Sequence, residues 1–463
     1  MTPYLSQISG IPPILVAALS IVFLLVAILR FKLHAFITLL IASMLVAILS
    51  GMPLTEIHAS IQKGMGGVLG FIATIVGLGA IFGKILEHSG GTEALARKMI
   101  KVFGHERASW SMVITGFLVS IPVFLDAGLV ILIPIIYALT RESGRPLLYF
   151  GIPLTAGMAV THSFVPPTPG PIAVAELLGA DLGWVILFGV IVGIPTAIVA
   201  GPVFGSWISK KITVGVPELM DEEGDALKEL DDQNLPSFWV ILGLIGIPIV
   251  LILLSSVMKF FTDSGTIEPS LFTDFIQFIG HPFAALILAV LLSLFFLGVR
   301  RGVSNQELMD TCSKALAPAG LIILVTGAGG VFKQILIDSE AAAQLAEILK
   351  SSGLPILILA YLLAVIVRVI QGSATVAMIT AASLLSPLIV EMNLLPSPQE
   401  KALWVLAIAA GASILSHVND SGFWLVSRYF GLTEKQTLQS WTVMISLVSV
   451  VGFLLVLLVS LFV

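Results

Sequence analysis

Charged side chains are scarce in this chain of 463 residues: only 11% are Asp, Glu, Lys or Arg, while 57% are hydrophobic. A soluble domain of average composition carries about 25% charged residues. No soluble packing could bury so much apolar surface or cover it with so few charges. The composition therefore excludes a soluble enzyme, a nucleic-acid-binding protein and a disordered scaffold. It indicates a protein that crosses a membrane many times.

Other common features are missing as well. The single cysteine, Cys312, excludes an intramolecular disulfide and makes a thiolate metal cluster implausible. The sequence contains no HExxH, CxxC or Walker A motif, so zinc proteolysis and ATP hydrolysis have no residues to carry them. The N-terminus has no basic region, and we expect the first apolar run to be a retained span. We therefore expect no enzymatic activity, no cofactor and no metal.

Apolar runs long enough to cross about 30 Å of hydrocarbon predict ten spans. They lie near 11–29, 35–50, 66–86, 147–178, 184–206, 238–257, 282–299, 318–337, 402–426 and 441–462. Two further apolar stretches, near 109–140 and 354–390, are too long for one span and are interrupted in the middle. We interpret them as re-entrant hairpins, which enter the bilayer and leave on the same side. The predicted fold is an all-α polytopic membrane protein.

The positions of Lys and Arg test this arrangement through the positive-inside rule. With both termini outside and neither hairpin crossing, seventeen of these residues fall on the cytoplasmic side and five outside, while Arg368 lies within the second hairpin. Eight acidic residues gather in the segment 218–232, which is then cytoplasmic. The net charge of −5 therefore comes from this one segment.

The two halves of the chain resemble each other. The segment 77–89 reads GLGAIFGKILEHS, and the segment 327–339 reads GAGGVFKQILIDS. Each predicted repeat, 1–208 and 237–463, contains five spans and one hairpin, and an acidic linker at 209–236 joins them. An odd number of spans forces the repeats into opposite orientations. Inverted repeats with broken helices are typical of secondary transporters, whose site lies between the repeats near the membrane midplane.

Polar residues interrupt the first hairpin and the fourth span. The hairpin tip at 120–128 carries one charge, Asp126, which either caps the second arm or belongs to a substrate or proton site. The fourth span breaks at THSFVPPTPGP, 161–171, because four prolines and a glycine cannot continue a helix. Unwound backbone at this depth lines a cavity or is buried in protein. His162 is either a ligand there or a satisfied core histidine.

The second hairpin and the ninth span are interrupted in a similar way. At the tip of the hairpin, Gly372 allows close backbone approach and Ser373 supplies a hydroxyl. Arg368 either binds a substrate carboxylate, pairs with Asp126 or Asp420, or reaches toward the surface. The ninth span breaks at SHVNDSG, 416–422, where Asp420 is either part of a proton relay or a helix cap.

At these four segments the sequence resembles the gluconate permease family, proton symporters within the wider ion-transporter superfamily. The stretches that carry the resemblance are GMGGVLGF (64–71), IPVFLDAG (121–128), FVPPTPGP (164–171), GAGGVFKQILIDS (327–339), IQGSATVA (370–377) and SHVNDSGFWL (416–425). Many members carry His in the PPxPGP motif where this chain has Thr168. Any role of that His therefore does not transfer to this chain.

The resemblance implies uptake of gluconate or a related small hydroxy acid together with H⁺ across a bacterial inner membrane. Relatives within the family use glycerate, other sugar acids or D-serine. The superfamily further implies a homodimer and an elevator-like mechanism. Na⁺ coupling remains the alternative to H⁺, since hydroxyls and unwound carbonyls at the second hairpin tip offer oxygen ligands.

These observations predict a site between the four breaks, in contact with a small organic acid and surrounded by lipid. In the predicted mechanism, the hairpins with spans four, five, nine and ten move against a scaffold of spans one to three and six to eight. The expected substrate-binding residues are Thr161, His162, Ser163, Thr168, Gly170, Arg368, Gln371, Gly372, Ser373, Thr375 and Asn419. The expected carriers of the coupling proton are Asp126, His162, His417 and Asp420.

Overall fold

A computed structural model describes residues 16, 19, 22, 23, 26, 27, 31, 33–104, 107–217, 235–339, 353–418 and 420–463. All regular elements in these residues are helices, which confirms the predicted all-α class. Of the first predicted span, only isolated residues are described, and the acidic segment 218–232 lies outside the described residues.

The helices of the first half are α2 (Ala35–Leu49), α3 (Leu54–His88), α4 (Gly91–Phe103), α5 (Ala108–Val119), α6 (Leu125–Ser143), α7 (Leu148–Phe164), α8 (Pro169–Leu178), α9 (Leu182–Ile198) and α10 (Phe204–Ile208). A π-helical turn, Val199–Val203, makes α9 and α10 continuous. The predicted interruptions of the first hairpin and of the fourth span are both present, between α5 and α6 and between α7 and α8.

The helices of the second half are α12 (Phe238–Asp263), α13 (Leu271–Ile279), α14 (Pro282–Ser293), α15 (Asn305–Asp338), α17 (Ile356–Gln371), α18 (Ala374–Glu391), α19 (Pro398–Gly411), α20 (Ser421–Tyr429), α21 (Glu434–Thr437) and α22 (Val443–Val459). The other two predicted interruptions separate α17 from α18 and α19 from α20. All four breaks were therefore predicted correctly.

Eight helices among the described residues are long and apolar enough to cross a bilayer. They are Leu54–His88, Leu148–Leu178, Leu182–Ile208, Phe238–Asp263, Pro282–Arg301, Asn305–Asp338, Ala374–Glu391 and Glu434–Val459. One of them, α18, belongs to the second predicted hairpin. A helix of this length is compatible both with an arm of a re-entrant hairpin and with a full span. The outer faces of these helices are apolar: Leu187, Ile191 and Ile194 of α9 all project outward, as expected of a surface covered by lipid.

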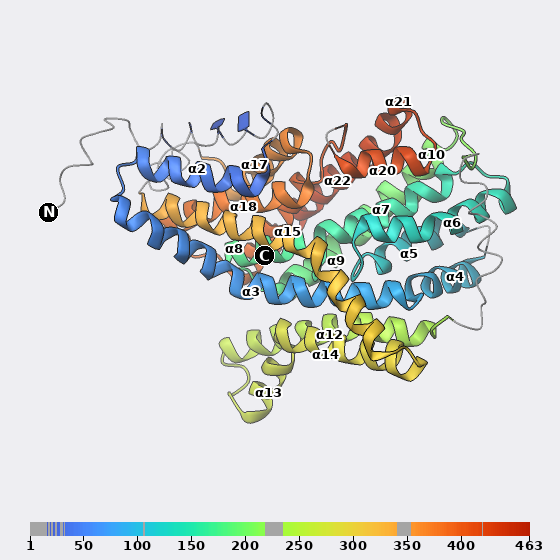
Figure 1. The fold of residues 1–463 in the computed structure, drawn as a ribbon, viewed down its shortest axis with the longest axis horizontal. Helices are drawn as coiled ribbons and strands as arrows, with labels where there is room; N and C mark the ends of the chain where they lie inside the picture. The colour runs from blue at the N-terminus through green and yellow to red at the C-terminus, as the bar shows by residue number, and fades with distance from the viewer. Residues whose placement is uncertain are drawn as a thin grey trace.

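The long helices α3 and α15 pack against each other along much of their length (Figure 1). They pack tightly at Gly64 and Gly330, where a Cβ atom added at Gly64 would lie 2.6 Å from the Gly330 carbonyl oxygen. Only glycine allows the two backbones to meet in this way. Small residues of this kind drive helix association in membranes, where apolar surface alone gives no advantage over lipid.

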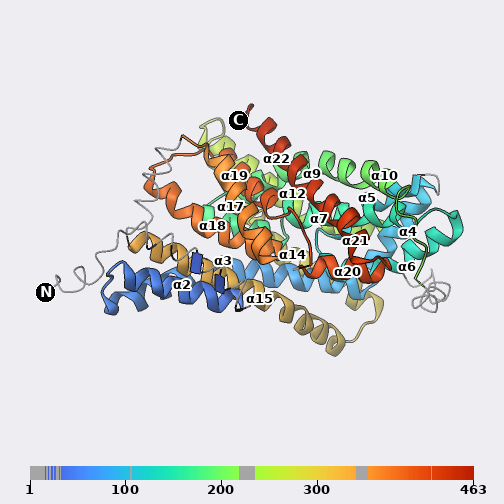
Figure 2. The same cartoon turned by 90° about the horizontal axis from the view of Figure 1, so that it is seen from above.

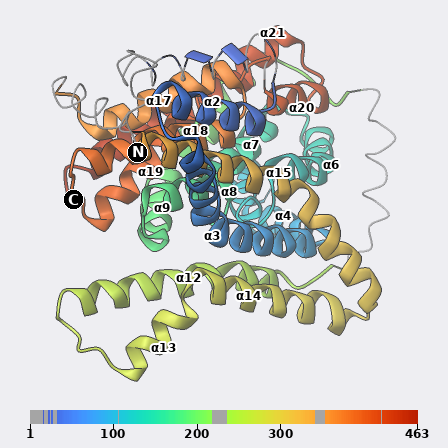
Figure 3. The same ribbon diagram turned by 60° about the vertical axis from the view of Figure 1, so that its left-hand side comes forward.

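The remaining helices form two groups around this pair. Helices α9, α19 and α22 pack together on one side (Figure 2). Helices α12 and α14 form a separate layer along α9 and α3, with α13 projecting from it (Figure 3). Of the broken helices, α7 and α8 pack against α9, and α17 and α18 pack against α19.

Candidate functional site

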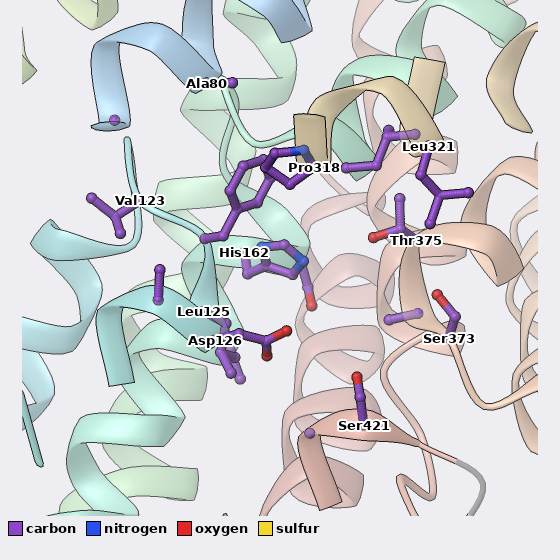
Figure 4. Close-up of a pocket in the computed structure, with 18 of the residues that line it drawn as sticks. Ala80, Val123, Leu125, Asp126, His162, Pro318, Leu321, Ser373, Thr375 and Ser421 are labelled. Carbon is purple, nitrogen blue, oxygen red and sulfur yellow. The ribbon is translucent and has the colours of Figure 1, made fainter. Parts of the chain in front are cut away.

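A cavity of about 470 Å³ lies where the four breaks meet. The first break contributes Pro122 to Ala127, the second His162 and Ser163, the third Ser373 to Val376, and the fourth Ser413 and Asp420 to Gly422. Figure 4 shows Asp126 and His162 facing the side of the cavity that Ser373 and Thr375 line. Cavities of this size are typical of sites for small molecules. Segments separated by up to 300 residues thus form one candidate site, as the sequence predicted.

The first-turn residues of three helices, α6, α18 and α20, line this cavity. The first N–H groups of a helix have no partner within the helix, and they carry the positive end of the helix dipole. Three such ends directed at one cavity favour a bound anion. The Ser373 hydroxyl accepts a weak hydrogen bond from the Val376 N–H at 3.5 Å, which leaves the preceding N–H groups of α18 available.

Arg368 lies at the wall of the cavity near the end of α17 and is only 2% exposed. Its Nη2 donates to Oδ2 of Asp420 at 2.6 Å, and its Nε donates to the Ile414 carbonyl oxygen at 3.3 Å. Its Nη1 is buried without a protein partner. Of the alternatives that the sequence left open, the ion pair with Asp420 is therefore present. The guanidinium nevertheless keeps one unsatisfied donor.

Asp420 is held in place by several donors. Besides Arg368, it accepts a short hydrogen bond from the Ser416 hydroxyl and one from the Gly422 N–H at 3.2 Å, which caps α20. Trp441, which lines the cavity from the last span, donates from Nε1 to the Ser416 Oγ at 2.7 Å. These hydrogen bonds form a chain from Trp441 through Ser416 and Asp420 to Arg368, and the chain fixes the orientation of the guanidinium.

The other acidic side chain at the breaks, Asp126, is exposed to the cavity at the first turn of α6. It has no hydrogen-bonded or ion-paired partner in the part of the chain that the structure describes. It lines the same cavity as Asp420. The helix-capping role that the sequence left open is not observed, since Phe124 is the cap of α6 and makes no side-chain hydrogen bond.

His162 and Ser163 reach the cavity from the end of α7. The Nδ1 atom of His162 is buried without a partner, which argues against a satisfied core histidine. Ser163 Oγ lies 2.9 Å from Ser413 Oγ, so the broken helices α7 and α19 contact each other through these hydroxyls.

Several residues predicted to bind the substrate, and the predicted proton carrier His417, do not line this cavity. The Thr161 hydroxyl donates to the Phe117 carbonyl oxygen of α5 at 2.9 Å, and the Thr168 hydroxyl donates to the Val165 carbonyl oxygen at 2.8 Å. Gly170 packs against Met378, and His417 Nε2 lies 3.3 Å from the Val369 carbonyl oxygen. Asn419 and the side chain of Gln371 lie outside the described residues. Gly372 has a φ of +84° at the break between α17 and α18.

Three charged residues that the sequence reasoning missed also line the cavity. Lys84 and Glu87 of α3 pair at 2.6 Å, and Lys314 reaches the cavity from α15. The sequence contains an indication for two of them, because Lys84 and Glu87 lie in the segment 77–89 that resembles the segment 327–339. No group of three or more His, Cys, Asp or Glu side chains among the described residues could hold a metal ion.

The C-terminal part of α15, away from the cavity, is held to the end of α8 by hydrogen bonds. Lys333 Nζ donates to the Leu177 carbonyl oxygen at the end of α8 at 2.8 Å, and the Ser386 hydroxyl donates to the same oxygen at 2.6 Å. At 1.5 Å per residue, Lys333 lies roughly 28 Å along α15 from Lys314. Lys84, Glu87 and Lys314 form the charged rim of the cavity, and Lys333 and Ser386 form a clamp on the end of α8. Lys314 of the rim and Lys333 of the clamp therefore lie near opposite ends of a membrane-spanning helix.

Solved structures of other proteins have a similar fold. The YdaH transporter of Alcanivorax borkumensis matches with a TM-score of 0.60 and 18% sequence identity, over 88% of this chain and 90% of that chain. At this identity the match shows the fold alone.

The curated relatives match along nearly their whole length. A low-affinity gluconate transporter of Escherichia coli K12 is 41% identical over 439 residues, which are 95% of this chain and 96% of the relative. A gluconate permease of Pseudomonas aeruginosa is 42% identical over 447 residues, 96% of this chain and 97% of the relative. An L-idonate transporter of E. coli K12 is 36% identical over 450 residues, 97% of this chain and 99% of the relative.

The family model described as GntP family permease matches residues 12–462. Together with relatives at about 40% identity over their full length, this match confirms the resemblance that the four breaks indicated. The family and its curated relatives are transporters and not enzymes. The chain therefore belongs to the GntP family of permeases and is a multi-pass membrane transporter.

Proposed function

We propose that this protein is a secondary active transporter that imports gluconate or a related small hydroxy acid together with H⁺. The relatives named as gluconate transporters support the substrate class. The observation that carries the proposal is the unsatisfied Nη1 of Arg368, buried at a cavity where three helix N-termini meet. A buried guanidinium donor without a partner is costly unless a ligand satisfies it. A carboxylate satisfies both the donor and the helix ends.

In the proposed complex, the substrate carboxylate lies between Arg368 and the first turns of α18 and α20. The hydroxyl groups of the substrate bond to Ser373, Thr375 and Ser421 and to the His162 side chain, all of which line the cavity. Lys84 and Lys314 at the rim attract the anion before it enters. This arrangement suits a monocarboxylate with several hydroxyls.

The proposed transport cycle is of the elevator type, within a homodimer in the bacterial inner membrane with both termini outside. The two hairpins and the broken helices move against α3 and α15, and the cavity with its charged rim opens to the cytoplasm. The clamp of Lys333 and Ser386 on α8 closes the opposite side. Outward opening then requires Lys333 to release the end of α8.

Reconstituted protein in proteoliposomes tests the proposal. Radiolabelled gluconate is expected to accumulate when the lumen is alkaline, in the absence of Na⁺, and unlabelled gluconate inside is expected to drive counterflow. A channel does not accumulate substrate against its gradient, and a Na⁺-coupled carrier needs Na⁺ at fixed pH. Glycerate, L-idonate and D-serine as competitors rank the alternative substrates. Absence of counterflow for every one of these compounds contradicts the proposal.

Thr161 provides a test of which hydroxyls serve the substrate. Its hydroxyl bonds to the Phe117 carbonyl oxygen, so Thr161→Val is expected to lower the free energy of unfolding by about 1 kcal/mol. The affinity for gluconate is expected to stay unchanged. Thr375→Val removes a hydroxyl that lines the cavity and is expected to weaken binding several-fold with little effect on stability. Calorimetric titration and a thermal-unfolding assay separate the two effects.

A further inference from the structure

Two acidic residues from the breaks share the cavity, but their surroundings differ. Asp420 accepts hydrogen bonds from Arg368, Ser416 and the Gly422 N–H, one of which is an ion pair at 2.6 Å. These donors hold the Asp420 side chain in one orientation, and its nearest cation is the Arg368 guanidinium.

Asp126 has no such donors. Within the described residues nothing donates a hydrogen bond to it and no cation pairs with it, although it is exposed to the cavity. Asp420, which also carries a carboxyl group, lines the same cavity. Since the Arg368 charge is already balanced by Asp420, the Asp126 carboxylate lacks a counter-charge of its own.

The other ionisable groups around Asp126 do not supply one. His162 of α7 lines the same cavity and interacts through space with Asp420. Lys84 and Glu87 of α3 pair with each other at the rim, where Lys314 of α15 also lies. Helix α4, which packs against α6, carries Glu93, Arg97, Lys98 and Lys101, but none of them lines the cavity, and Glu93 pairs with Arg97 at 2.6 Å.

We propose that the Asp126 carboxylate is the site that binds the coupling proton, and that Asp420 serves only to hold Arg368 in position. The inference rests on the proposed function and names the group that couples it to H⁺. One proton adds to one carboxylate oxygen of Asp126 in the outward-open state and leaves it in the inward-open state. Arg368 and Asp420 keep their charges throughout.

Electrostatic repulsion explains why proton and substrate bind together. A substrate carboxylate entering next to ionised Asp126 places a second negative charge in a cavity where Arg368 is already balanced by Asp420. Protonation of Asp126 removes one of these charges and supplies an O–H donor for a substrate hydroxyl. By linkage, the affinity for the anionic substrate is then lost as the pH rises, about ten-fold per pH unit where the free protein does not hold the proton.

The experiment measures the dissociation constant of gluconate between pH 5.5 and 8.5, together with counterflow and accumulation driven by a pH gradient. Wild-type protein is expected to show the pH-dependent affinity and to accumulate gluconate. Asp126→Asn is expected to bind with an affinity that no longer depends on pH, to retain counterflow, and to lose accumulation. Asp126→Glu restores a titratable carboxyl group and is expected to recover the pH dependence.

Three variants serve as controls. Glu87→Gln removes another carboxylate that lines the cavity and is expected to keep the pH dependence. His162→Gln is expected to bind more weakly but with the same pH slope. Asp420→Asn is expected to lose binding at every pH, because Arg368 is released. Gradient-driven accumulation by Asp126→Asn, or a pH slope that disappears only in His162→Gln or Asp420→Asn, overturns the inference.

Absence of gluconate counterflow in the wild type contradicts the proposed function, whereas the outcomes above contradict only the assignment of the proton to Asp126. If Asp126→Asn does not fold, the pH at which the affinity for gluconate falls is compared in wild-type, Asp126→Glu and Glu87→Gln protein. A different pH in Asp126→Glu alone supports the inference, and the same pH in all three contradicts it.

Discussion

Replacing Arg368 with Met is expected to abolish measurable binding of gluconate. Truncating one partner of a buried, hydrogen-bonded charge pair costs about 2–5 kcal/mol, which corresponds to a loss of affinity of roughly 30-fold to a few thousand-fold. Here the substrate carboxylate loses its guanidinium partner, and Asp420 loses its counter-ion at 2.6 Å. Arg368→Lys keeps the charge but not the planar fork, and it is expected to recover only part of the affinity. Calorimetric titration with gluconate measures both.

A double variant separates binding from folding. Arg368→Met alone leaves Asp420 as an unpaired charge, and it is expected to destabilise the protein by about 3–5 kcal/mol. Adding Asp420→Asn removes that charge and keeps one oxygen to accept from the Gly422 N–H at the start of α20, while an NH₂ group replaces the oxygen that accepts from Ser416. The double variant is expected to regain most of the thermal stability but none of the affinity. Arg300→Ala, at an exposed arginine, is the matched control with unchanged affinity. Gluconate binding by the double variant contradicts the assignment of Arg368.

The sequence predicted the location of the cavity because its signals are local. A run of prolines at 164–171, or polar residues in an apolar stretch, interrupts a helix wherever the helix lies. In a membrane such interruptions must be sheltered by protein, so four of them are expected to meet. The structure places all four at one cavity.

The contacts of individual side chains could not be predicted from the sequence. Thr161 and Thr168 were predicted ligands, but short hydroxyl side chains readily bond to nearby backbone carbonyls, as both do here. The choice of Arg368 between Asp126 and Asp420 depends on how α17 and α20 pack, since the partners are 52 residues apart. Trp441 was not predicted to line the cavity, because nothing in the sequence around it indicates its contact with Ser416.

The close packing of α3 against the first hairpin suggests a second large effect. A Cβ atom at Gly83 of α3 would lie 1.9 Å from the carbonyl oxygen of Pro122 and 2.9 Å from its carbonyl carbon. These are backbone atoms in the break between α5 and α6, so no side chain can rotate away. Gly83→Ala therefore forces the hairpin tip and α3 apart by roughly 1.5 Å, the difference from an ordinary contact of 3.4 Å.

We expect Gly83→Ala to lower the free energy of unfolding by about 3 kcal/mol, the upper range for overpacking a well-packed interior. The displaced tip also carries Asp126 and the first turn of α6, so the affinity for gluconate is expected to fall at least ten-fold. Thermal unfolding and calorimetric titration measure the two effects. Gly79→Ala, one turn earlier in α3, is the matched control, because its Cβ would find the nearest atom at 3.7 Å.

The control substitution is expected to be neutral or slightly stabilising, since alanine favours the helix over glycine by up to about 1 kcal/mol. The contrast between the two alanines isolates the contact with Pro122 from any general effect of losing a glycine in α3. Equal stability and equal affinity of the two variants contradict a rigid hairpin tip. In the proposed elevator cycle this tip slides past α3, so Gly83→Ala is also expected to slow gluconate counterflow more than the loss of affinity alone explains.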